Sequence, residues 1–115
     1  MTTRTLIRAA FWVATLSVLV LSLLPTSTPL PSTGWDKSNH VLGFAILAAL
    51  GSLGYRRQGL KVSVGLLAFG VLIEVLQAFS GYRFAEWGDL LSDMIGIALG
   101  ILTAWLAGRT LPKPR

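Results

Sequence analysis

The stretch LKVSVGLLAFGVLIEVLQAF, residues 60–79, decides the fold class of this chain. A helix needs about 20 mostly apolar residues to cross the hydrocarbon core of a bilayer, and this run has that length. A strand or an irregular loop could not take its place, because unpaired backbone groups are too unfavourable in lipid. The run therefore predicts a transmembrane helix, and it carries one acid, Glu74, inside the span.

Three further apolar runs flank this one, at about residues 6–24, 38–55 and 89–107. The first could be a signal peptide, but its core is longer than the usual stretch of about 7–15 residues and no A-x-A site follows it. Residues 1–115 are 53% hydrophobic and only 13% charged, so the surface must meet lipid. We expect one all-α membrane domain, a bundle of four transmembrane helices whose main partner is the bilayer.

The basic residues predict the orientation of these spans, because lysine and arginine gather in short cytoplasmic loops. Most of them fall on the side of the bundle that holds both termini, which we therefore expect in the cytoplasm. On that side lie Arg4, Arg8, Arg56, Arg57, Lys61, Arg109, Lys113 and Arg115, and on the other lie Lys37 and Arg83.

The overall charge and the cysteine count exclude several classes of protein. The net charge of +5 comes from short clusters between apolar runs, which is a topology signal and not a nucleic-acid-binding surface. The chain has no cysteine, so disulfides, thiolate zinc sites and cysteine nucleophiles are excluded.

The acids follow a different pattern from the bases, since all five fall in the outer half of the expected bundle. An acid inside a span is unfavourable by about 2.5–3.5 kcal/mol on insertion scales, which makes Glu74 a functional candidate. At 1.5 Å per residue, Asp93 lies about 6 Å below Asp89, close to the level of Glu74. The acids are Asp36, Glu74, Glu86, Asp89 and Asp93, and His40 follows Asp36 by one helical turn.

Helical phase predicts that these residues converge. At 100° per residue each ionisable group shares a stripe with small residues, which mark close approach between membrane helices. We expect the three stripes to meet and the acids to line a polar pocket that opens outward. The stripes are Asp36, His40, Gly43, Leu47 and Gly54; then Ser63, Gly70, Glu74 and Gln77; then Asp89, Asp93, Gly96, Gly100 and Thr103.

Each candidate also has a purely structural interpretation. Asp36 and Asp89 stand where a span begins, so either could cap a helix. His40 could be an interfacial hydrogen-bonding residue, and Glu86 a loop surface residue. Lys37 and Arg83 could only balance charge, and Glu74 and Asp93 could pair inside the bundle.

Three ordered motifs give the chain a family resemblance. Asp36-Lys37-Ser38-Asn39-His40 followed by Phe44 resembles the D-K-x-x-H-x-x-x-F signature of the VanZ-like family. Glu74-Val75-Leu76-Gln77 is similar to its E-x-x-Q step. Gly81-Tyr82-Arg83 and then Asp89, Asp93, Gly96 and Gly100 resemble its closing pattern of R, D, N, G and G, with aspartate here where that pattern usually has asparagine.

The resemblance implies a small polytopic protein of the bacterial cell membrane. The namesake of the family is linked to low-level resistance to the glycopeptide teicoplanin. The resemblance implies no known reaction, and carrying the resistance over to this chain is analogy alone.

The favoured hypothesis is binding of an envelope lipid, a lipid-linked precursor or a glycopeptide in the outward-facing pocket. Arg83 could hold a phosphate, and Gln77 could contact a sugar or an amide. The candidate ligand-binding residues are Asp36, Lys37, His40, Glu74, Gln77, Arg83, Asp89 and Asp93.

Three other functions stay open. An enzyme acting on a lipid-linked substrate could use His40 as acid or base, although no known catalytic motif is present, so a non-enzyme is favoured. No cofactor is required, but a divalent metal ion on His40, Glu74, Asp89 and Asp93 would be chemically reasonable. A structural or assembly role, with a thin bundle that self-associates, and a proton-coupled transporter are the remaining alternatives.

Overall fold

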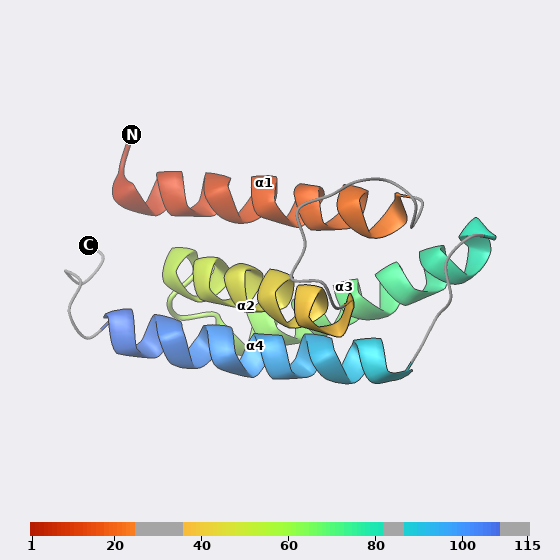
Figure 1. Cartoon of the computed structure of the whole chain (residues 1–115). Helices are drawn as coiled ribbons and strands as arrows, with labels where there is room; N and C mark the ends of the chain where they lie inside the picture. The colour runs from red at the N-terminus through yellow and green to blue at the C-terminus, as the bar shows by residue number, and fades with distance from the viewer. Residues whose placement is uncertain (25–35, 82–86, 109–115) are drawn as a thin grey trace.

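The computed structural model describes residues 1–24, 36–81 and 87–108. They form four α-helices, α1 (Thr3–Leu23), α2 (Asp36–Gly54), α3 (Gly59–Ser80) and α4 (Trp87–Gly108). Consecutive helices are antiparallel, so the start of α1 and the end of α4 lie at the same end of the bundle (Figure 1). The prediction of an all-α four-helix bundle is confirmed, and each helix boundary lies close to the expected one.

Three of the four helices are long and apolar enough to cross a membrane, namely α1, α3 and α4. Their 21 or 22 residues correspond to about 31–33 Å at 1.5 Å per residue, close to the hydrocarbon thickness of about 30 Å. Helix α2 has 19 residues and is less apolar, because its first turns, from Asp36 to His40, are polar. The rest of α2 is as apolar as its neighbours.

Helices α2 and α4 pack backbone to backbone through two glycines of α4. A Cβ atom placed on Gly100 would meet the carbonyl oxygen of Ala45 and would lie 2.7 Å from the Cβ of Ala48. A Cβ atom on Gly96 would meet the carbonyl oxygen of Val41 and would lie 3.0 Å from the Cβ of Phe44. Only glycine fits at such distances, and the expected close approach at Gly96 and Gly100 is confirmed.

Helix α1 lies at the edge of the bundle and is fastened to the end of α2. The Arg8 Nε atom donates a hydrogen bond of 2.7 Å to the carbonyl oxygen of Gly54, and the guanidinium lies 4.3 Å from the ring centroid of Tyr55. The indole of Trp12 donates to the Tyr55 hydroxyl at 3.0 Å. Among the residues of α1, Phe11 alone is buried, so the outer side of this helix is left to lipid.

The stripe expected on α2 is partly wrong. A Cβ atom on Gly54 would lie 3.1 Å from the Arg8 side chain, and one on Gly43 would lie 3.6 Å from Val18, so both glycines face α1. The α4-facing side of α2 carries Ala45 and Ala48 instead. The reason is that α2 is the central helix and packs on two sides, so its small residues serve two interfaces.

An apolar groove of about 520 Å³ lies between α1 and α3, near the loop that joins α2 to α3. Its walls include Phe11, Trp12, Leu66 and Phe69, and Lys61 stands at its edge. Its lining includes neither His40 nor any of the described acids, which lie in the opposite half of the bundle. In a bilayer, an apolar groove on the bundle surface would be filled by acyl chains or by another helix.

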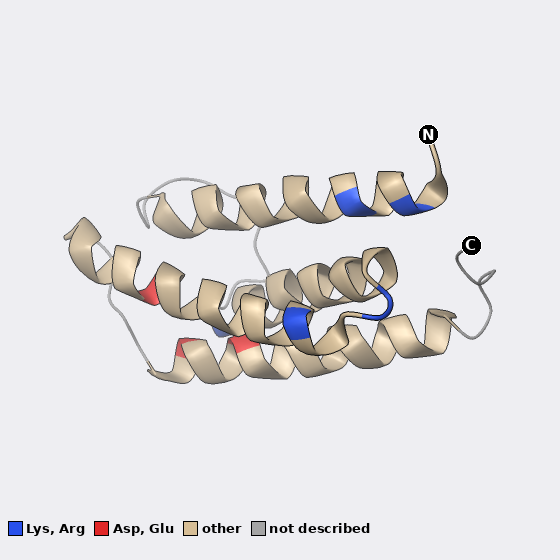
Figure 2. Ribbon diagram, turned by 180° about the vertical axis from the view of Figure 1, so that it is seen from behind, with Lys and Arg blue, Asp and Glu red and all other residues tan. Residues whose placement is uncertain are grey.

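The charges divide between the two halves of the bundle (Figure 2). Most of the described basic residues lie toward the end that holds the start of α1 and the loop between α2 and α3, whereas Lys37 lies with the described acids in the opposite half. This is the distribution expected from the sequence, and it separates a basic end from an acidic, ionisable end.

Candidate functional site

A buried histidine–carboxylate pair joins α2 to α4. The Nδ1 atom of His40 lies 2.8 Å from Oδ1 of Asp93, and the two residues are 8% and 0% exposed. If Asp93 is ionised, its carboxylate can only accept this hydrogen bond, and Nδ1 is then the donor. This contact brings together two residues that sequence phase placed on converging stripes.

Asp89 and Lys37 continue the cluster toward the end of the bundle. Oδ2 of Asp89 lies 3.9 Å from Nε2 of His40, and Oδ1 of Asp89 lies 3.4 Å from Nζ of Lys37. The Asp89 side chain is 4% exposed and that of Lys37 is 31% exposed. Helix α4 begins at Trp87, so Asp89 lies in its first turn and past the N-cap position. The helix dipole favours a negative charge in the first turn.

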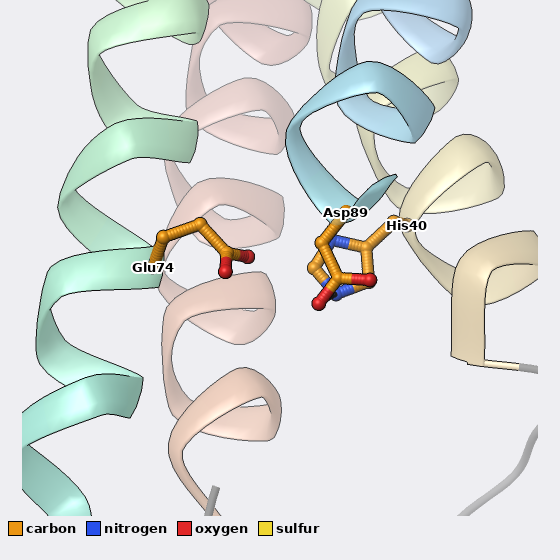
Figure 3. Close-up of side chains that lie close together, drawn as sticks. All are labelled: His40, Glu74 and Asp89. Carbon is orange, nitrogen blue, oxygen red and sulfur yellow. Dashed lines mark ion pairs between the residues drawn. The ribbon is translucent and has the colours of Figure 1, made fainter. Parts of the chain in front are cut away.

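Glu74 reaches the cluster from α3. Its carboxylate points from α3 toward Asp89 and His40 (Figure 3). One ligand atom from each of His40, Glu74 and Asp89 lies within 4.8 Å of the others. Oε1 of Glu74 is buried, although the residue as a whole is partly exposed. Three helices therefore contribute side chains to one cluster of ionisable residues. We call it the His40 cluster, and its members are Lys37, His40, Glu74, Asp89 and Asp93.

Two glycines make room for the His40 cluster. A Cβ atom on Gly70 of α3 would lie 2.7 Å from Oδ2 of Asp93, so the glycine lets the carboxylate fit against α3. A Cβ atom on Gly88 would lie 2.8 Å from the Lys37 Cε atom. Gly70 was expected from its place on the stripe of Glu74. Gly88 was missed, and its position directly before Asp89 was the only available signal.

Gln77 makes a hydrogen bond between α3 and α1. Its Nε2 atom donates a hydrogen bond of 2.9 Å to the carbonyl oxygen of Ser22 and so fastens α3 to the end of α1. The side chain is 1% exposed, and its Oε1 atom has no hydrogen-bond partner among the described residues. The structure thus gives Gln77 an interhelical contact, whereas the sequence favoured contact with a ligand.

Ser63 and Thr103, at the other ends of the expected polar stripes, do not join the cluster. Ser63 donates to the carbonyl oxygen of Gly59 and Thr103 to that of Leu99, so each hydroxyl is satisfied by its own helix. The candidates Arg83 and Glu86 lie outside the described residues, and so does the side chain of Asp36.

Three members of the His40 cluster are buried, whereas Lys37 and Glu74 are partly exposed. His40, Asp89 and Asp93 are 8%, 3% and 0% exposed, and the side chain of Lys37 is 31% exposed. Helices α2, α3 and α4 pack around these three side chains, and the outward opening expected from the sequence stays a prediction. Such a cluster can hold a small cation among its oxygen and nitrogen atoms, or present Lys37 to an anionic group, but it cannot enclose a large molecule.

The apolar helices and the buried ionisable cluster define a small helical membrane protein. A family model identifies it further. The VanZ/LLP1 model matches residues 4–108, and the chain belongs to this family. The resemblance carried by the motifs of α2, α3 and α4 is confirmed. A search of curated proteins and a search of solved structures each gave no significant match.

Proposed function

We propose that this chain is a four-pass protein of the bacterial cell membrane that binds a phosphate-bearing headgroup at the outer surface. The ligand would be an envelope lipid or a lipid-linked envelope precursor. The observation that carries the proposal is the position of Lys37. Its side chain, at the rim of the bundle, is 31% exposed, and its ammonium group lies 3.4 Å from the buried carboxylate of Asp89.

The orientation rests on the basic end of the bundle. Positive charge in short loops faces the cytoplasm, so the end with Arg8, Arg56 and Lys61 would be cytoplasmic. The His40 cluster would then lie below the outer surface. Four passes follow if α2 also crosses, which its place between α1 and α4 supports, because the other three helices have the length and hydropathy of membrane spans.

The burial of the cluster narrows the choice of ligand. A glycopeptide is far larger than the space among His40, Asp89 and Asp93, whereas a phosphate can approach Lys37 from the headgroup layer. A lipid headgroup or a lipid-linked precursor is therefore favoured over a glycopeptide. The link to teicoplanin resistance would then be indirect, and it rests on analogy with the namesake of the family.

The proposal predicts that Lys37→Gln weakens the binding of phosphate lipids about fivefold, because a lysine near the headgroups contributes about 1 kcal/mol to anionic lipid binding. Native mass spectrometry of the protein in nonionic detergent would measure retention of phosphatidylglycerol, of an isoprenoid phosphate and, as a zwitterionic comparison, of phosphatidylcholine. Stronger retention of phosphatidylglycerol would indicate a membrane lipid, and stronger retention of the isoprenoid phosphate would indicate a lipid-linked precursor.

Lys61→Gln is the matched control, since Lys61 is exposed at the opposite end of the bundle. Retention that falls with Lys37→Gln and stays unchanged with Lys61→Gln supports the proposal. Equal loss in both variants, or retention of phosphatidylcholine as strong as that of phosphatidylglycerol, would contradict it.

The groove between α1 and α3 favours a second candidate function, assembly with another helix. It is lined mostly by apolar side chains, and α1 beside it is exposed along most of its length. A helix from a partner or from a second copy could fill it. In the same mass spectra, a dimer that is insensitive to Lys37→Gln would favour this role.

A further inference from the structure

We propose that the His40 cluster holds one divalent cation, bound by His40, Glu74 and Asp89, and that Asp93 orients His40 without binding the ion. The ion would face the headgroup layer beside Lys37, where a phosphate oxygen could complete its coordination. The inference rests on the proposed function only for that phosphate. The ion site itself stands on the geometry of the three ligand residues.

The hydrogen bond to Asp93 fixes the role of each imidazole nitrogen. Nδ1 lies 2.8 Å from Oδ1 of Asp93, and if it donates to an ionised Asp93, a neutral His40 keeps its lone pair on Nε2. Metal-binding histidines usually have this arrangement, in which the second nitrogen donates to a carboxylate that holds the ring in place. Asp93 is completely buried behind the ring, in the space left by Gly70, so it supports the histidine from the inner side.

The atoms on the other side of the ring have the spacing of ligands that share an ion. Oδ2 of Asp89 lies 3.9 Å from Nε2 of His40, which is longer than a hydrogen bond. Nitrogen and oxygen ligands bind zinc at about 2.0–2.2 Å, so two ligand atoms of a tetrahedral zinc ion lie about 3.3–3.6 Å apart. The ligand atoms of His40, Glu74 and Asp89 lie within 4.8 Å of one another, so small side-chain rotations would bring all three within bonding distance of one ion.

The charges of the cluster also suit a divalent cation. Glu74, Asp89 and Asp93 bring three carboxylates to one place between the helices, and Lys37 approaches them with one ammonium group. A divalent ion and Lys37 together carry as much positive charge as these carboxylates carry negative charge. Bound ions are a common way to stabilise charges that are withdrawn from water. One nitrogen and two oxygen ligands suit zinc or manganese, with positions left for water or phosphate.

The test measures the ion alone, without lipid. The full chain would be purified in detergent, stripped of metal with a chelator and dialysed. It would then be titrated separately with Zn²⁺ and Mn²⁺, and the bound metal would be measured by elemental mass spectrometry. We expect one ion per chain. Asp89→Asn and Glu74→Gln, which preserve side-chain shape, should each weaken binding by more than about 100-fold, beyond the 10–100-fold typical of outer-shell changes. Ser92→Ala, a change at a buried residue of α4 that is not a ligand, should bind as the wild type does.

Asp93 is a positioning residue, and its variants separate that role from a ligand role. Asp93→Leu removes the acceptor for Nδ1 and should weaken binding about 10–100-fold, with one ion still bound at saturation. Asp93→Asn keeps an oxygen acceptor and should recover most of that loss. The visible spectrum of bound Co²⁺ should keep its shape in both Asp93 variants and change in Asp89→Asn.

The inference is overturned if the wild type binds neither ion, or if Asp89→Asn and Glu74→Gln bind as tightly as Ser92→Ala. A Co²⁺ spectrum that changes equally in Asp93→Asn and Asp89→Asn would overturn the division of roles. Failure here is distinct from failure of the proposed function. An ion bound without any Lys37-dependent lipid would leave the ion site standing and contradict the headgroup proposal, and Lys37-dependent lipid without an ion would do the reverse.

Discussion

Replacement of Gly100 by leucine is expected to lower the free energy of unfolding by more than about 3 kcal/mol, beyond the usual cost of overpacking. Even a Cβ atom at this position would meet the carbonyl oxygen of Ala45 and lie 2.9 Å from the backbone nitrogen of Ala49. Because these are backbone atoms of α2, a rotamer change cannot relieve the clash, and the two helices must separate.

The measurement is unfolding in mixed micelles of increasing denaturing detergent, followed by circular dichroism and tryptophan fluorescence. Ala98→Leu is the matched control, since it adds the same side chain to an exposed position on the same helix. The control should unfold as the wild type does. A Gly100→Leu protein as stable as Ala98→Leu would show that α2 and α4 are not in backbone contact.

Replacement of His40 by leucine is expected to destabilise the bundle by about 3 kcal/mol, because it leaves the buried carboxylate of Asp93 without the hydrogen-bond partner that His40 provides. Asp93, which is 0% exposed, would lose the 2.8 Å hydrogen bond from Nδ1 and remain between the helices. The cost arises from the carboxylate left behind more than from the lost contact itself.

The double variant His40→Leu/Asp93→Leu should therefore recover much of the lost stability, because an apolar pair of similar volume carries no buried charge. A double-mutant cycle in metal-free buffer measures the coupling between the two residues. Additive losses, with the double variant less stable than either single variant, would contradict a direct buried pair.

Much of the fold could be predicted because membrane helices have a strong sequence signal. The four apolar runs were enough to place four helices within a few residues of their observed ends. The step of one turn from Asp36 to His40, repeated from Asp89 to Asp93, also placed the two residues that meet at 2.8 Å on facing helices. The glycines Gly96 and Gly100 marked the contact between α2 and α4 for the same periodic reason.

The remaining features depend on which neighbour each helix face meets, and periodicity does not contain that information. Gly43 and Gly54 are small and in phase with His40, yet they pack on α1 because α2 is central. Gln77 is in phase with Glu74, but it lies beside the end of α1 and donates to Ser22. The burial of the cluster also follows from how tightly Gly70 and Gly96 let the helices close, which the sequence pattern alone did not specify.

The central claim is that the His40 cluster lies at the outer end of a four-pass bundle, and cysteine labelling in intact cells tests it most directly. The chain has no cysteine, so single substitutions give no background. A membrane-impermeant maleimide should label Ser32→Cys, between α1 and α2, in intact cells. It should label Gln58→Cys, between α2 and α3, only after the membrane is permeabilised. The reverse pattern would place the cluster at the cytoplasmic face, and labelling of both sites from outside would show that α2 does not cross; either result would contradict the account.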